Sequence, residues 1–420
     1  MMNKCRYDNA ETGLAVDMVR EVHNKDNNPV QRLVLKVSVA VACRILFNTV
    51  RRFPYTFAAV LSRGLGVPLT AITTLIAVNQ ATGILGLFFG PLADRFGYRM
   101  FMLIALGMLV VGMFAGGLFP SYWVVMGALF LAGLGKNAFD SAIQGYFAHR
   151  VPFARRARIV GAVELGWAGS TLIGIPIVGL LMDTLGWRSF FFITGALGVL
   201  GILTMKALIA GDSQPRDSSN RSLRIGAALL HMSRGRTVFG ALVFIFLVNV
   251  ANDALFVVYG PWLGQTFDLS IGALGAGTGV IGLAELSGEF LTVWISDRIG
   301  LKRSVIIGVI LSIVCYAALP VVGRTLPLAL ISLFSIFLTF EFYIVTFLSL
   351  TTELKPEMRA TMIAGNLAAA GLGRIVGALM GGVIWLSGGL VAVALTSAFV
   401  SCLGLVVLIW GLKRWPNPQS

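Results

Sequence analysis

The sequence predicts an all-α polytopic membrane protein with twelve transmembrane helices in two bundles of six. High hydropathy, apolar runs of helix length and an internal repeat support this prediction. Of the 420 residues, 57% are hydrophobic and 12% are charged, and the mean hydropathy is +0.84, whereas soluble domains average about 25% charged residues. The continuous apolar runs of about 20 residues suit membrane-spanning helices and exclude the alternating strands of a β-barrel.

The apolar runs define the expected spans and domains. In the first half we place spans at about 33–62, 68–89, 101–119, 121–146, 159–182 and 189–210. In the second half they fall at about 237–263, 271–295, 304–322, 326–350, 360–387 and 389–411. The expected domains are an N-terminal tail (1–32), a bundle (33–210), a linker (211–236), a second bundle (237–411) and a C-terminal tail (412–420).

The basic residues are distributed unevenly among the expected loops. Both tails and one set of alternate loops hold most Lys and Arg outside the spans, whereas the opposite loops hold only Arg63, Arg188 and Arg324. The positive-inside rule therefore predicts a multi-pass protein of the cytoplasmic (inner) membrane with both termini in the cytoplasm. Membrane topology accounts for the net charge of +14, so we expect no nucleic-acid partner, and no apolar signal-peptide core lies near Met1.

Cofactor chemistry has little support in the sequence. The four cysteines are scattered and the three histidines fall in tails or loops, which argues against disulfides and a metal site. No Walker motif is present, so ATP hydrolysis is not expected. We expect no cofactor, with the proton gradient as the energy source.

Two loops repeat at nearly one offset. The segment Asp94 to Arg99 (DRFGYR) is matched by Asp297 to Lys302 (DRIGLK), 203 residues later, and Pro152 to Arg155 is matched by Pro356 to Arg359, 204 residues later. The two offsets indicate an internal duplication of a six-helix unit.

The first of these loops carries a family signature. Its pattern G-x-L-a-D-R-x-G-r-k is met by Gly90, Leu92, Ala93, Asp94, Arg95, Gly97 and Arg99. In the second copy Val293 replaces the opening glycine, while Asp297, Arg298, Gly300 and Lys302 are kept. The chain thus resembles a major facilitator superfamily transporter. This resemblance implies two pseudo-symmetric bundles, alternating access and no enzymatic activity, and we expect a monomer surrounded by lipids.

Within that family the motifs are closest to the twelve-span drug:proton antiporters. The fifth span contains Gly174 to Gly179 (GIPIVG), similar to their G-P-x-x-G core, although Ile175 separates Gly174 from Pro176 and Leu180 replaces a glycine. Their fourth-span motif is also altered, because Lys136 stands later along the helix than the usual arginine.

Charged residues inside spans are expected to be functional, because a charge in hydrocarbon is costly. On the first span Arg44, Asn48, Arg51 and Tyr55 share one helical face. That face suits an anionic or polar substrate group; alternatively the arginines pair with Asp253 or Glu341, and Arg52 extends to the outer surface. We further expect Asp253 to bridge to Arg51 or Arg52 as a gate. The candidate substrate-binding residues are Arg44, Asn48, Arg51, Arg52, Tyr55, Asn249, Asp253 and Glu341.

Carboxylates within the spans are the candidate proton-coupling residues. Glu285 and Glu289 lie one turn apart on the eighth span, and two such carboxylates cannot both ionise at low cost in a low dielectric. One of them is expected to exchange a proton, or alternatively to pair with Arg374. Glu164 and Glu341 are expected as isolated carboxylates and are the other candidates.

The repeated loops are expected to form a conformational latch and not a substrate site. Asp94 is placed to cap a helix N-terminus of the other half, and Arg95 and Arg99 to hold acidic partners or lipid phosphates. Lys136 and Asp140, four residues apart, permit a local salt bridge, and the resemblance suggests that Asp140 pairs with the arginines of the Asp94 loop. The latch residues are Gly90, Asp94, Arg95, Gly97, Arg99, Asp140, Asp297, Arg298, Gly300 and Lys302.

The expected function is secondary transport of a small molecule. The fifth-span motif favours proton-coupled export of an organic compound or drug. The arginine stripe favours proton-coupled uptake of an anionic metabolite, and a lipid or glycolipid flippase would use the same cationic face for a phosphate head group. A membrane receptor without transport is the remaining alternative.

Overall fold

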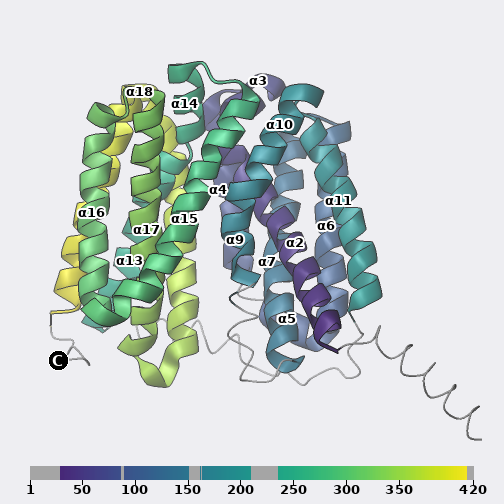
Figure 1. Cartoon of the computed structure of the whole chain (residues 1–420), viewed down its shortest axis with the longest axis horizontal. Helices are drawn as coiled ribbons and strands as arrows, with labels where there is room; N and C mark the ends of the chain where they lie inside the picture. Colours follow the sequence, from purple (N-terminus) through teal and green to yellow (C-terminus); the bar gives the residue numbers. More distant parts are fainter. Residues whose placement is uncertain (1–28, 87–88, 151–160, 162, 210–234, 414–420) are drawn as a thin grey trace, which may run out of the picture.

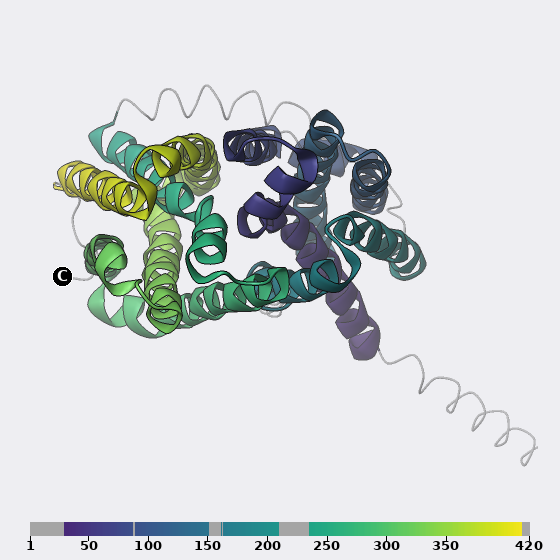
Figure 2. The same ribbon diagram turned by 90° about the horizontal axis from the view of Figure 1, so that it is seen from above.

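The structure is a computed structural model that describes residues 29–86, 89–150, 161, 163–209 and 235–413. Within these residues the regular elements are helices, most of which stand side by side in two groups (Figures 1 and 2). The expected tails and linker fall largely outside the described residues.

In the N-terminal half helices occupy the described parts of the six expected spans. Its elements are α2 (Pro29–Thr56), α3 (Ala58–Leu65), α4 (Leu69–Leu85), α5 (Phe89–Phe96), α6 (Tyr98–Leu118), α7 (Tyr122–Arg150), α9 (Gly166–Gly169), the π-helix η2 (Ser170–Gly174), α10 (Ile175–Leu185) and α11 (Ser189–Leu208). The C-terminal half comprises α13 (Arg236–Phe256), α14 (Tyr259–Phe267), α15 (Ile271–Ile299), α16 (Leu301–Val322), α17 (Leu326–Leu354), the 3-10 helix η3 (Pro356–Met358) and α18 (Arg359–Gly411).

The number of membrane-crossing helices is consistent with the sequence. Among the described residues ten helices are long and apolar enough to cross a bilayer, or eleven when α3 and α4, bent by 115°, count as one span. That count treats α18 as one helix, but Gly389 interrupts it with φ 59° and ψ −153°. Because only glycine adopts this conformation readily, α18 divides there into the two last predicted spans. The prediction of an all-α polytopic membrane protein is confirmed.

The repeated motif forms a tighter connection than the expected charged turn. Asp94 and Arg95 lie in helix α5, and Gly97 alone separates α5 from α6, with φ 88°. Gly300, at the equivalent place between α15 and α16, has φ 92°. Both copies therefore depend on a glycine at a positive φ.

The basic residue that closes each motif stabilises its own bundle. Arg99 donates to the backbone carbonyl of Lys206 at 2.7 Å, and Lys302 donates to that of Leu412 at 2.9 Å. Each carbonyl lies at the end of the last helix of the same half, where carbonyls lack helical partners and the helix dipole favours a cation. The internal repeat thus extends to a repeated helix cap.

The two halves meet near the end that holds α3 and α14 (Figure 1). There α10 and α15 approach so closely that a Cβ added to Gly179 would lie 2.9 Å from Gly275 Cα. Across the same end the hydroxyl groups of Thr56 and Tyr259 lie 2.6 Å apart. The protein is therefore closed at this end.

A break in the fifth span shapes the centre of the protein. Pro176 lies in the first turn of α10 and has no N–H to donate to the carbonyl of Leu172. The preceding turn widens into the π-helix η2, as π-turns do at such interruptions. Thr171 lies in this widened turn and contacts both α2 and α15.

Candidate functional site

A buried ion pair joins the two halves at the centre of the protein. Arg52 on α2 donates to both carboxylate oxygens of Glu285 on α15, each at 2.8 Å, and the side chains are 3% and 6% exposed. Thr171 donates to Glu285 at 3.0 Å and also contacts Arg52. A bidentate pair, in which a guanidinium donates two hydrogen bonds to one carboxylate, is among the strongest polar contacts in proteins.

This pair corrects three expectations. Arg52 neither extends to the outer surface nor bridges to Asp253, and Glu285 does not pair with Arg374. The reason is geometric, because successive residues of a helix differ by about 100° in direction. Arg52 consequently faces α15, whereas Arg51 faces α4 within its own half.

Asp253 makes a different link between the halves. Its carboxylate accepts a hydrogen bond of 2.8 Å from the Tyr55 hydroxyl, which in turn accepts one of 2.6 Å from the Gln80 amide. Arg374 approaches Asp253 only to 3.9 Å and donates instead to Asn249 at 3.2 Å. The expected gate between Asp253 and Arg51 or Arg52 is therefore absent from this conformation, and a tyrosine takes the place of the arginine.

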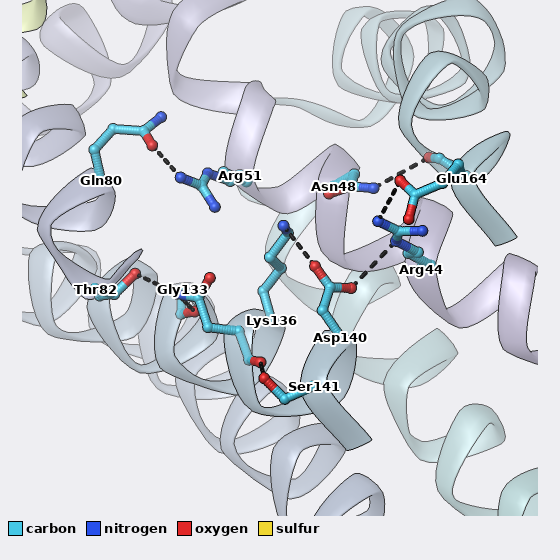
Figure 3. Close-up of polar contacts among 12 residues, drawn as sticks. Arg44, Asn48, Arg51, Gln80, Thr82, Gly133, Lys136, Asp140, Ser141 and Glu164 are labelled. Atoms are coloured by element: carbon cyan, nitrogen blue, oxygen red, sulfur yellow. Dashed lines mark hydrogen bonds and ion pairs between the residues drawn. The ribbon is translucent and has the colours of Figure 1, made fainter. Parts of the chain in front are cut away.

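Arg51 has no ion-pair partner. Figure 3 shows its guanidinium directed toward Gln80, whose side-chain oxygen accepts a hydrogen bond from it. Within the described residues no carboxylate lies within 4 Å of Arg51, and its Nε lacks a hydrogen-bond partner although the residue is only 9% exposed.

Arg44 and Asn48 on α2 contact residues of their own half (Figure 3). Arg44 lies 2.8 Å from Glu164 and 3.2 Å from Asp140, and Asn48 donates to the backbone carbonyl of Gly166 at 3.2 Å. Lys136 lies 2.7 Å from Asp140, so the predicted local salt bridge is confirmed. Glu164 was expected to be isolated, but it pairs with Arg44.

Glu289 and Glu341 lie next to the Arg52–Glu285 pair. A Cβ added to Gly288 on α15 would lie 2.8 Å from the Cβ of Glu341 on α17. Glu341 is 8% exposed, and Glu285 and Glu289 are the negative groups that act on it most strongly. Among the described residues neither Glu289 nor Glu341 has an ion pair. Of these three carboxylates, Glu285 is therefore the one that binds a guanidinium.

Trp167 on α9 lies among cations from both halves. The centre of its ring is 4.0 Å from the Arg52 guanidinium, 5.6 Å from that of Arg374 and 5.8 Å from the Lys136 ammonium. An aromatic face attracts cations at such distances. Trp167 therefore connects α2, α7 and α18.

The latch residues make contacts within their own halves. Asp94 accepts a hydrogen bond from Tyr98, and Asp140 pairs with Arg44 and Lys136. Among the described residues Asp94 makes none of the expected contacts with a helix of the other half, and Asp140 makes none with the Asp94 loop. Arg95 and Arg298 are exposed, and the side chain of Asp297 lies outside the described residues.

Sequence reasoning missed the uncharged members of the site. Gln80, Trp167, Thr171 and Tyr259 all contact the charged residues or link the halves. A glutamine in the apolar run of α4, and a tryptophan beside Gly166 in the fifth span, were available as signals. No cluster of metal-ligating side chains occurs in the described parts of the chain.

Known proteins share this sequence and architecture. The chain is 26% identical over 298 residues to the uncharacterized MFS-type transporter YceJ of Bacillus subtilis, covering 71% of this chain and 75% of the relative. It is 24% identical over 337 residues to multidrug resistance protein MdtG of Escherichia fergusonii (79% and 82% covered). It is 23% identical over 250 residues to the sialic acid transporter NanX of Escherichia coli (58% and 60% covered).

A solved structure has the same fold. The crystal structure of a D-xylose-proton symporter superposes with a TM-score of 0.72 at 18% identity, covering 92% of this chain and 98% of that one. A sequence profile of the Major Facilitator Superfamily matches residues 38–364 and 242–420. The chain is therefore a multi-pass membrane transporter and not an enzyme, and it belongs to the Major Facilitator Superfamily.

Proposed function

We propose that the chain exports a small organic compound in exchange for protons. The observation that supports this most directly is the buried pair of Arg52 and Glu285, which joins the two halves. Transporters of this architecture work by moving one half against the other around a central site. A contact that depends on the charge of one carboxylate can therefore couple protonation to that movement.

Coupling follows from competition for Glu285. The ionised carboxylate binds Arg52 strongly. A protonated carboxyl group binds it less strongly, because it has lost the charge that strengthens its hydrogen bonds to the guanidinium. Protonation of Glu285 would weaken the link between α2 and α15. Glu289 and Glu341 lie next to this pair and form no ion pair among the described residues, so they are additional places for the proton.

Export is favoured by the sequence relatives and by the expected topology. MdtG is named as a multidrug resistance protein. The basic loops predict cytoplasmic termini and a cytoplasmic-membrane location. With that orientation α3 and α14 face the outside, so the conformation described here is closed to the outside and suited to receive a substrate from the cytoplasm.

Uptake of an anionic metabolite by proton symport is the second candidate. The guanidinium of Arg51 supports it, because among the described residues its bonded acceptor is the neutral Gln80 and not a carboxylate, as does the similarity to a relative named as a sialic acid transporter. Both candidates use the same carboxylates and differ in whether substrate and proton move in opposite directions or together.

The experiment is a flux assay in proteoliposomes. The purified protein is supplied with candidate compounds under a pH gradient of either sign, while a pH-sensitive dye inside the vesicles reports protons. For an exporter, substrate and proton cross in opposite directions. Glu285→Gln is expected to transport substrate down its own gradient without proton movement.

Companion variants separate the carboxylates. Glu289→Gln and Glu341→Gln are expected to reduce coupling, and Glu164→Gln tests the carboxylate that pairs with Arg44. Glu353→Gln is the matched control, because Glu353 forms an exposed ion pair with Arg359 outside this site. Wild-type proton coupling in the Glu285, Glu289, Glu341 and Glu164 variants alike would contradict the proposal.

A further inference from the structure

Among the described residues Arg51 is a buried cation with no carboxylate within 4 Å, although the charges of Asp140 and Asp253 also act on it. It is 9% exposed, its bonded acceptor is the neutral side chain of Gln80, and its Nε has no partner in the described chain. The other two arginines of α2, Arg44 and Arg52, each lie 2.8 Å from a carboxylate. A buried charge without a counter-charge in contact is costly, so an anion bound directly to Arg51 would stabilise it.

A second guanidinium, on the other half, acts electrostatically on Arg51. Arg374 on α18 has a side chain 26% exposed, and its nearest carboxylate oxygen among the described residues, on Asp253, lies 3.9 Å away. Among the charged groups around Arg51, Arg374 acts on it most strongly. Gln80, Tyr55 and Asp253 form a chain of contacts between the two arginines, which belong to opposite halves. Among the described residues neither guanidinium has a carboxylate oxygen closer than 3.9 Å.

Trp167 supplies an aromatic surface beside Arg374. Its ring centre is 5.6 Å from the Arg374 guanidinium, and its side chain is only partly buried. The Arg52 guanidinium lies 4.0 Å from the same ring centre, so a flat group of a ligand would stack on the part of the ring that Arg52 leaves uncovered.

From these observations we infer that Arg51 and Arg374 together bind the anionic group, a carboxylate or a phosphate, of a small organic substrate. The inference rests on the proposed transport function and names its substrate class. Guanidinium groups bind both anions through paired hydrogen bonds. Because the arginines belong to opposite halves, an anion between them replaces repulsion with attraction and draws the halves together around the substrate.

Binding of four related compounds to the purified full-length protein tests this inference. Benzoate and phenyl phosphate carry the two anionic groups, benzamide is a neutral analogue, and benzylamine is a cation. Binding is followed by quenching of tryptophan fluorescence at millimolar concentrations. We expect at least one anion to bind more tightly than benzamide and benzylamine, and the comparison of benzoate with phenyl phosphate identifies the preferred group.

Variants assign the binding to the two arginines. Arg51→Gln and Arg374→Gln are each expected to weaken anion binding about tenfold to hundredfold, the usual effect of removing a charged hydrogen bond. Arg51→Lys keeps the charge and is expected to retain part of the affinity, which separates a binding defect from misfolding. Arg63→Gln on the exposed surface of α3 is the control and is expected to bind as the wild type.

Three results would overturn the inference. They are the absence of anion binding, equal binding of benzamide or benzylamine, and wild-type anion affinity in both glutamine variants. Failure of the proposed function is distinguishable: Arg51-dependent anion binding without any coupled proton flux in proteoliposomes would refute proton exchange alone. Proton-coupled transport of a cationic compound by Arg51→Gln would refute the anion site alone.

Discussion

Arg52 and Glu285 form two hydrogen bonds of 2.8 Å to each other, and the pair connects α2 of one half with α15 of the other. Both side chains are almost fully buried, so each would be an uncompensated charge without its partner. The contact therefore stabilises the interface between the halves only while both charges are present, and Thr171 adds a hydrogen bond to Glu285.

Removal of one partner is expected to cost more stability than removal of both. Arg52→Met or Glu285→Leu alone leaves a buried charge unpaired, at a cost of about 3–5 kcal/mol. The double variant removes both charges and replaces them with apolar groups of similar size, which is often neutral. Thermal unfolding of the purified variants in detergent measures the difference, and a double variant no more stable than the singles would contradict the account.

The Tyr55 hydroxyl is expected to help hold the α3–α14 end closed. Tyr55→Phe removes its bond to Asp253 and the bond that it accepts from Gln80. One hydrogen bond contributes about 1 kcal/mol, or about fivefold in the equilibrium between closed and open. Spin labels at the exposed positions Arg63 on α3 and Gln265 on α14, in a cysteine-free background, report the distance across this end.

A matched hydroxyl provides the control for this prediction. The Tyr122 hydroxyl donates to the backbone carbonyl of Ala71 at 3.1 Å within the N-terminal half. Tyr122→Phe therefore loses one hydrogen bond without affecting the interface between the halves. If both phenylalanine variants shift the distance distribution equally, the link between Tyr55 and Asp253 does not control closure.

Close packing of α10 against α15 is expected to be a second condition for closure. A side chain at Gly179 would meet Gly275 Cα at 2.9 Å and the carbonyl of Ile271 at 3.0 Å, and overpacking costs about 1–3 kcal/mol. Gly179→Leu should therefore populate the open state at the α3–α14 end, as measured with the same spin labels. Gly107→Leu is the control, since a Cβ at Gly107 meets no atom within 4 Å; equal distances in both variants would refute the prediction.

The architecture was predictable because it depends on hydropathy and on repeated motifs, which are read over many residues. Hydropathy over windows of about 20 residues locates the spans, and the repeated motif locates the two halves. Where a single residue controls the geometry, the sequence was less informative. The motif around Asp94 was expected as a turn, but Gly97 alone leaves the helical conformation, since helix α5 continues almost to the next span.

The pairing of charges was harder to predict because it depends on rotation as well as depth. The repeat offset of 203 residues places Asp253 at the depth of Val50, next to Arg51, but depth does not say which side of a helix faces the partner. In the structure Arg51 and Arg52 face different helices. Lys136 and Asp140 were predictable as a pair because both lie on one helix, where a spacing of four residues fixes their direction.

Asp140 is expected to stabilise the N-terminal half, independently of transport chemistry. Its carboxylate lies 3.2 Å from Arg44 and 2.7 Å from Lys136, and its side chain is 15% exposed. Asp140→Asn removes the charge between two largely buried cations, so we expect a loss of about 3 kcal/mol in the free energy of unfolding. Thermal unfolding in detergent measures it. Ser141→Ala, which removes a side-chain bond to the backbone carbonyl of Asn137 on the same helix, is the control. An Asp140→Asn variant as stable as that control would show that Glu164 alone compensates Arg44 and that Lys136 needs no partner.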